Sequence, residues 1–158
     1  MKKSKSMWFL IVWFFWAFGK DCTLLYSYQT TSDFFVFNDL GLAPLFFILT
    51  GIVLLLNLAS LIYMLKPKVV GLKVALGALA AGVVNTLITM GLGLLNIEGM
   101  KQAYVISRES RGLHVSEDSL ALIFTPSTLV LTVVASCAVY GLLAYFLTRN
   151  RAYFEDGS

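Results

Sequence analysis

The sequence predicts an all-α integral membrane protein, built as a bundle of four transmembrane helices. The first observation is composition: 58% of the 158 residues are hydrophobic and 13% are charged, whereas a soluble domain carries about 25% charged residues. The second is three long apolar runs, residues 44–65, 69–95 and 120–148, which together contain one charged residue, Lys73. About 20 apolar residues are enough for a helix to cross the hydrocarbon core of a bilayer.

The third observation is that the charges lie in the gaps between the runs and that their sign alternates from gap to gap. Eight of the 12 basic residues lie in one set of gaps or, for Lys73, just inside the run that follows: Lys2, Lys3, Lys5, Lys66, Lys68, Lys73, Arg149 and Arg151. The other gaps, 20–43 and 96–119, hold seven of the nine acids. Lysine and arginine collect on the cytoplasmic side, so we expect both termini to be cytoplasmic. A bacterial cytoplasmic (inner) membrane is the simplest location.

The first span needs the most argument, because its uninterrupted apolar stretch, residues 7–18, is only 12 residues long. That stretch gives about 18 Å of helix, and the hydrocarbon core is about 30 Å thick. The helix must therefore extend over about residues 5–26, which brings Lys20 and Asp21 into it. No small-x-small cleavage site follows, so we expect an uncleaved span rather than a signal peptide.

The second and third spans follow directly. Pro44 suits the first turn of a helix over 44–65, because its missing N–H needs no partner there. The segment Lys66-Pro67-Lys68 ends that helix, and the helix over 69–95 starts after this short turn. Spans 2 and 3 are therefore expected to form an antiparallel hairpin.

The fourth span, 120–148, contains Pro126, which either kinks the helix or marks a restart at Thr125. The two loops in the acidic gaps, at about residues 27–43 and 96–119, are expected to lie on the extracytoplasmic side and to carry short amphipathic helices. In the second loop, for example, Ile97, Met100 and Tyr104 recur at helical spacing. The whole chain is read as one transmembrane domain.

Polar residues inside the apolar runs are the candidates for a functional site. The candidate ligand-binding residues are Asp21, Lys20, Asn57, Asn85, Thr89, Thr132 and Ser136. The first interpretation of the uncharged candidates is structural. Asn57 and Asn85 would hydrogen-bond each other, or the hydroxyls that recur along the last span (Thr125, Thr128, Thr132 and Ser136), and so hold the bundle together. The alternative is a polar cavity at mid-membrane that binds a small ligand.

Lys20 and Asp21 also allow two interpretations. Near the outer boundary of span 1 they would be interfacial anchors, with the lysine reaching toward the headgroups. If Asp21 instead turns inward, it is the best single candidate for binding a cation or an amine, because an ionisable residue at membrane depth is a functional hypothesis by default.

The sequence gives no support for a catalytic, metal or cofactor site. It contains no GxSxG, HExxH or P-loop pattern, and its single histidine, His114, lies outside the spans. The segment 114–118 is a weak candidate for metal binding, because it offers one histidine with two acids. Nucleic acid is not expected as a partner, because the basic residues flank spans instead of forming a stripe.

We therefore predict a non-enzymatic subunit or accessory protein of a larger or homo-oligomeric membrane assembly, with membrane lipids and a protein as partners. The alternative is a binder, carrier or channel for a small molecule, lipid or ion, using the polar layer at mid-membrane. An enzyme acting on a lipid comes third, because no nucleophile is paired with a base.

Overall fold

The structure is a computed structural model that describes residues 4–155, and all of the regular structure in this range is helical. The elements are α1 (Lys5–Tyr26), the 3-10 helix η1 (Tyr28–Thr30), α2 (Ser32–Asp39), α3 (Ala43–Leu65), α4 (Val69–Leu95), α5 (Ile97–Glu109), α6 (Glu117–Ile123), α7 (Pro126–Arg149) and α8 (Arg151–Glu155). Four of them, α1, α3, α4 and α7, are long and apolar enough to cross a membrane. The all-α fold with four helices of membrane-spanning length, as predicted from the sequence, is thus confirmed for the described residues.

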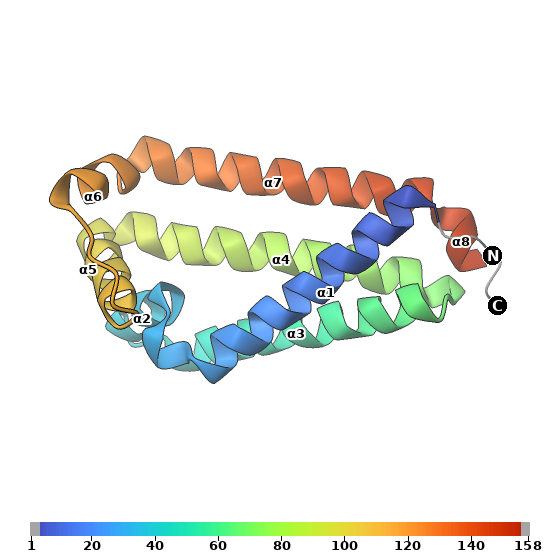
Figure 1. Cartoon of the computed structure of the whole chain (residues 1–158), viewed down its shortest axis with the longest axis horizontal. Helices are drawn as coiled ribbons and strands as arrows, with labels where there is room; N and C mark the ends of the chain where they lie inside the picture. Colours follow the sequence, from blue (N-terminus) through green and yellow to red (C-terminus); the bar gives the residue numbers. More distant parts are fainter. Residues whose placement is uncertain (1–3, 156–158) are drawn as a thin grey trace.

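The four long helices lie lengthwise in one bundle, and the start of α1 lies at the same end of it as α8 (Figure 1). We call this the terminal end, and the opposite end, where α2, α5 and α6 lie, the cap end. α1 crosses the bundle diagonally, close to α7 at the terminal end and close to α3 toward the cap end (Figure 1). The helices α1 and α7 therefore diverge along the bundle.

The larger of two hydrophobic cores lies toward the terminal end. Met7, Leu10 and Phe14 of α1 have no exposed surface, and they lie at the three- and four-residue steps that place side chains on one helix face. They pack with Met64, Ala75, Ala78, Leu79, Leu143, Leu147, Tyr153 and Phe154. This core unites all four long helices with α8.

Hydrogen bonds add to that core at the terminal end. Asn150, which follows α7, accepts a hydrogen bond at 2.6 Å from the Ser4 hydroxyl and donates to the Ser6 hydroxyl at 2.9 Å. The buried Tyr153 hydroxyl of α8 donates to the Met64 carbonyl at the end of α3, at 2.7 Å. The start of α1, the end of α7 and the end of α3 are thereby held together.

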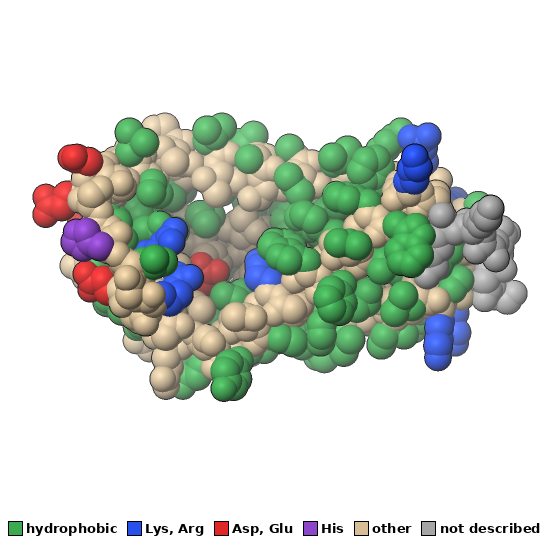
Figure 2. Space-filling model, viewed as in Figure 1, with side chains coloured by type: hydrophobic (Ala, Val, Ile, Leu, Met, Phe, Trp, Pro, Cys, Tyr) green, Lys and Arg blue, Asp and Glu red, His purple; other side chains and the backbone are tan. Residues whose placement is uncertain are grey.

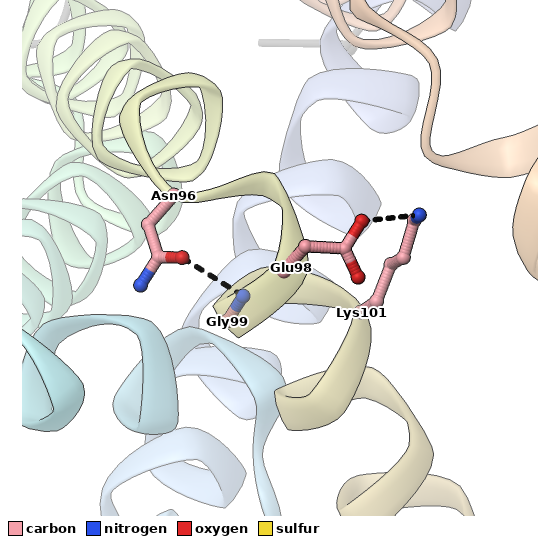
Figure 3. Close-up of polar contacts among 4 residues, drawn as sticks. All are labelled: Asn96, Glu98, Gly99 and Lys101. Carbon is pink, nitrogen blue, oxygen red and sulfur yellow. Dashed lines mark hydrogen bonds and ion pairs between the residues drawn. The ribbon is translucent and has the colours of Figure 1, made fainter.

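A second, smaller core joins the short helices at the cap end. It consists of Val36, Met100, Ala103, Phe124 and Leu129. Polar contacts fix the start of α5: the Asn96 side chain accepts a hydrogen bond from the Gly99 N–H at 2.9 Å, and Lys101 pairs with Glu98 at 2.7 Å (Figure 3). The Asn96 amide also donates to Asp39 at 2.6 Å, so one side chain caps α5 and links it to the end of α2.

The fourth predicted span is divided into two helices. α6 ends at Ile123, and α7 begins at Pro126 after two residues that are not helical. Of the two sequence alternatives, kink or restart, the structure therefore has the restart. The Thr125 side chain caps the new helix by accepting a hydrogen bond from the Thr128 N–H at 3.2 Å, and Pro126 occupies a first-turn position that needs no N–H.

Candidate functional site

A cleft lies between α1 and α7, on the side of the bundle toward the cap end. The two helices meet near the terminal end, where Phe9 and Phe146 pack edge to face with ring centroids 6.1 Å apart, and then separate. Figure 2, in the same orientation, shows a hollow between them with basic and acidic side chains inside it. We call this hollow the α1/α7 cleft, and its volume is about 550 Å³.

The cleft has apolar and aromatic walls that carry a few polar groups. Its lining is Trp13, Trp16 and Lys20 of α1, Thr86 of α4, and Thr128, Leu131, Thr132, Ala135, Ser136, Val139 and Tyr140 of α7. Thr86 and Thr132 donate their hydroxyl hydrogens to carbonyls one turn earlier in their own helices, Gly82 and Thr128, at 2.9 Å each. These hydroxyls therefore present lone pairs to the cavity, as hydrogen-bond acceptors.

A smaller chamber of about 60 Å³ extends from the cleft into the bundle. It shares Trp13, Trp16, Lys20, Thr86 and Tyr140 with the cleft, and it adds Ala17, Asp21, Val53, Asn57, Ala78, Leu79, Gly82 and Asn85. We call it the inner chamber. It is large enough for a few water molecules or one small polar group.

Asp21 and Asn57 form a buried polar pair in the inner chamber. The side chains are 4% and 6% exposed, and the Asn57 amide donates to Asp21 Oδ2 at 2.7 Å. Asn57 lies 14 residues after the start of α3 and eight before its end. The carboxylate is therefore turned inward, against the middle of a long apolar helix.

The Asp21 carboxylate keeps free hydrogen-bonding capacity. A carboxylate accepts up to about four hydrogen bonds, and within residues 4–155 only Asn57 donates one to it. Its nearest cation in sequence, Lys20, lies on the rim of both cavities and is exposed, and it makes no ion pair with Asp21 in the described range, where the ion pairs are Lys101–Glu98 and Arg151–Glu155.

Tyr140 forms part of the wall between the inner chamber and the cleft. Its ring lies directly on the backbone of α4, where a Cβ at Gly82 would be 2.9 Å from the Tyr140 hydroxyl oxygen. The absence of a side chain at residue 82 thus leaves the space in which this ring sits.

The structure brings together six of the seven candidate residues. Asp21, Asn57 and Asn85 line the inner chamber, Thr132 and Ser136 line the cleft, and Lys20 lines both. Thr89 is buried on α4 but lines neither cavity. The expected hydrogen bond between Asn57 and Asn85 is absent among the described residues; the Asn57 amide donates to the Asp21 carboxylate, so it links α3 to α1.

Sequence reasoning missed the aromatic part of the site. Trp13, Trp16 and Tyr140 line both cavities. A signal was present, because Trp13, Trp16 and Lys20 follow one another at three- and four-residue steps and so share a face of α1. Likewise, Thr128, Thr132 and Ser136 recur every four residues, and the next step is Tyr140.

A separate polar pocket lies at the cap end. Its volume is about 430 Å³, and its lining includes Ser27, Thr30, Asp33, Ser107 and Arg111. Asp33 also lines a neighbouring cavity of about 210 Å³, which shares Thr128 and Thr132 with the cleft. Burial raises the pKa of Asp33 above its ordinary value of 3.8, and the positive charge of Lys20 lowers it in part.

Asp33 should therefore reduce stability as the pH rises. Because its pKa is higher in the folded state, the folded protein binds the proton more tightly, and stability falls between pH 3.8 and the raised pKa. We expect Asp33→Asn to increase the unfolding midpoint above that window and to leave it unchanged below pH 3.8. Unfolding in detergent at both pH values checks this, and an equal gain at both would contradict it.

Other charged groups do not assemble into a site. His114, Glu117 and Asp118 are exposed, and across residues 4–155 no group of three or more His, Cys, Asp and Glu side chains is placed to hold a metal ion. Comparisons with known protein families, with curated proteins and with solved structures gave no match. The described residues form a helical bundle with four helices long and apolar enough to cross a membrane and with a cavity between two of them, α1 and α7.

Proposed function

We propose that the protein is a non-enzymatic membrane protein that binds a small amphiphilic molecule in the α1/α7 cleft. The observation that carries the proposal is the buried Asp21 carboxylate in the inner chamber, which shares five lining residues with the cleft of about 550 Å³. A carboxylate is costly to bury without partners. Its position next to a cavity of ligand size, about 300–1,000 Å³, supports a binding role.

The charge pattern supports a threading in which the terminal end is cytoplasmic and the cap end is extracytoplasmic. Lys66, Lys68, Arg149 and Arg151 lie at or beside helix ends at the terminal end, and basic residues favour the cytoplasmic side. With this threading, the cleft lies in the outer half of the membrane. A bacterial cytoplasmic membrane is the simplest location for the protein.

The position of the cleft favours a ligand that arrives from the bilayer. It opens between two helices that are long enough to span a membrane, and Leu131, Ala135 and Val139 give it an apolar wall. A helix with its side chains is about 10–12 Å across. A cavity of about 550 Å³ therefore has room for only about one of its turns. An amphiphile therefore fits the cleft better than a partner helix does.

The second candidate is the role of subunit in a larger or homo-oligomeric assembly, and it is favoured by the outer surface of α4. Gly77 is exposed, and a Cβ placed there would meet nothing within 4 Å. Ala81 follows four residues later, a spacing of small residues that allows helices to approach closely in lipid. Such contacts are compatible with ligand binding, because this surface is separate from the cleft.

Filling the cleft should displace the ligand. Ala135 lines the cleft, whereas Ala138, three residues along α7, is exposed and does not line it. Ala135→Trp should therefore remove most of an amphiphile that co-purifies with the wild-type protein, and Ala138→Trp should not. The measurement is mass spectrometry of small molecules and lipids retained by each protein, extracted in native nanodiscs. Equal retention of the same compounds by all three proteins would overturn the proposed function.

A further inference from the structure

The charged and hydrogen-bonding groups of the inner chamber indicate the chemical class of the ligand. Asp21 is 96% buried, since 4% of its surface is exposed, and its carboxylate lines the chamber. The uncharged side-chain amide of Asn57 donates one hydrogen bond to this carboxylate. No cation from residues 4–155 lies within ion-pair distance of Asp21.

The remaining groups around the chamber favour a hydrogen-bond donor with a positive charge. Thr86 faces the chamber as an acceptor, because its hydrogen is donated to the Gly82 carbonyl. Trp13 and Trp16 stand side by side with ring centroids 5.3 Å apart, and Tyr140 completes an aromatic wall. Indole and phenol rings attract cations through their faces.

We infer that the ligand is an amphiphilic primary amine, whose ammonium group donates hydrogen bonds to Asp21 in the inner chamber while its apolar body lies in the α1/α7 cleft. This inference rests on the proposed function of the cleft. The chamber of about 60 Å³ admits an ammonium with its first methylene groups, but it is small for a trimethylammonium group. An anionic head would meet the Asp21 carboxylate as a like charge.

Lys20 provides an independent check on the sign of the ligand charge. It lines both cavities from the rim, so its ammonium repels a cationic ligand and attracts an anionic one. Replacing Lys20 with Met therefore strengthens the binding of an amine or leaves it unchanged, and it weakens the binding of a carboxylate.

The test uses the full chain in lipid nanodiscs with Trp8→Phe as the parent protein, so that the fluorescence comes from Trp13 and Trp16 of the three tryptophans. Four C12 probes with a terminal bromine serve as quenchers: the primary amine, the trimethylammonium, the alcohol and the carboxylate. We expect saturable quenching by the primary amine at the lowest mole fraction. Asp21→Asn should raise the required fraction roughly tenfold or more, as expected for one charge-assisted hydrogen bond.

Two variants control for folding and for charge in general. Asp21→Asn keeps the shape of the side chain, and its unfolding midpoint is measured alongside binding. Glu98→Gln removes an exposed acid of α5 far from the chamber and should leave amine binding unchanged. Lys20→Met should retain or strengthen amine binding.

The outcomes separate the ligand class from the function. Preference for the carboxylate, lost in Lys20→Met, would overturn the amine and leave the cleft as a binding site. Preference for the trimethylammonium probe, or equal binding of amine and alcohol that Asp21→Asn does not change, would also overturn the primary amine. Saturable quenching by none of the four probes would overturn the proposed function together with the inference.

Discussion

Replacing Asn57 with Leu should lower the free energy of unfolding by about 1–3 kcal/mol, the cost of leaving a buried polar group without its hydrogen bond. The Asp21 carboxylate would lose the one donor that the described residues supply. The loss is expected mainly from the missing hydrogen bond, because Leu has the same branching and the same number of side-chain heavy atoms as Asn, and the larger Leu side chain has the adjoining inner chamber to occupy. Unfolding of the protein in bicelles with added SDS gives the measurement.

The double substitution Asp21→Leu with Asn57→Leu distinguishes this cause from others. Replacing both partners of a buried hydrogen bond by apolar groups is nearly neutral, so the double variant should be more stable than Asn57→Leu alone. It should also lose ligand binding, because the acceptor in the inner chamber is gone. If the two single losses simply add in the double variant, the coupling between Asp21 and Asn57 is refuted.

Gly71→Ala should destabilise the terminal end by about 1–3 kcal/mol, the usual range for overpacking a filled core. A Cβ at residue 71 would lie 2.6 Å from Cβ of Tyr63 and 3.1 Å from the Phe154 ring. Tyr63 Cβ is attached directly to the backbone of α3, so it cannot move without the helix. The unfolding midpoint in the same bicelle assay checks the prediction.

Two other glycines of α4 serve as controls. Gly77→Ala meets nothing within 4 Å, so it should leave stability unchanged or raise it slightly, since Ala favours a helix over Gly. Gly82→Ala meets the far end of the Tyr140 side chain, which can rotate away, so it should change ligand binding more than stability. Equal losses at all three positions would show that spacing between α3 and α4 is not the cause.

The sequence was sufficient for the class of fold, because apolar runs of spanning length need no tertiary information. α1 covers Lys5–Tyr26 and α4 covers Val69–Leu95, which are the predicted ranges. The division of the last span was open, because Pro126 is compatible with both a kink and a restart. In the structure the helix restarts, and the Thr125 side chain caps the new helix by accepting a hydrogen bond from the Thr128 N–H.

The candidate site was predictable in its residues but not in their pairing. Helical spacing identifies which side chains share a face, and it placed Thr132 with Ser136. It gives no information on the rotation or tilt of one helix against another. α1 runs diagonally across the bundle (Figure 1), and Asp21 lies next to Asn57 in the middle of α3.

The arrangement of the cores explains why a cleft exists in so small a bundle. The core at the terminal end holds α1 and α7 together through Phe14, Leu143 and Leu147, and the core at the cap end involves α7 but not α1. Between the two cores, the facing residues of α1 and α7 are Trp16, Lys20, Thr132 and Ser136. Their lack of mutual packing leaves the space that we assign to a ligand.

Amine binding in the α1/α7 cleft can be tested directly by NMR. The protein in nanodiscs is titrated with dodecylamine, and the three tryptophan indole N–H signals are followed. Trp13 and Trp16 line the cleft and the inner chamber, whereas Trp8 lines neither and serves as an internal reference. If dodecylamine binds in the α1/α7 cleft, the Trp13 and Trp16 signals should shift and saturate while the Trp8 signal stays in place. Parallel, non-saturating shifts of all three, as from simple partitioning into the bilayer, or no shift of any, would contradict it.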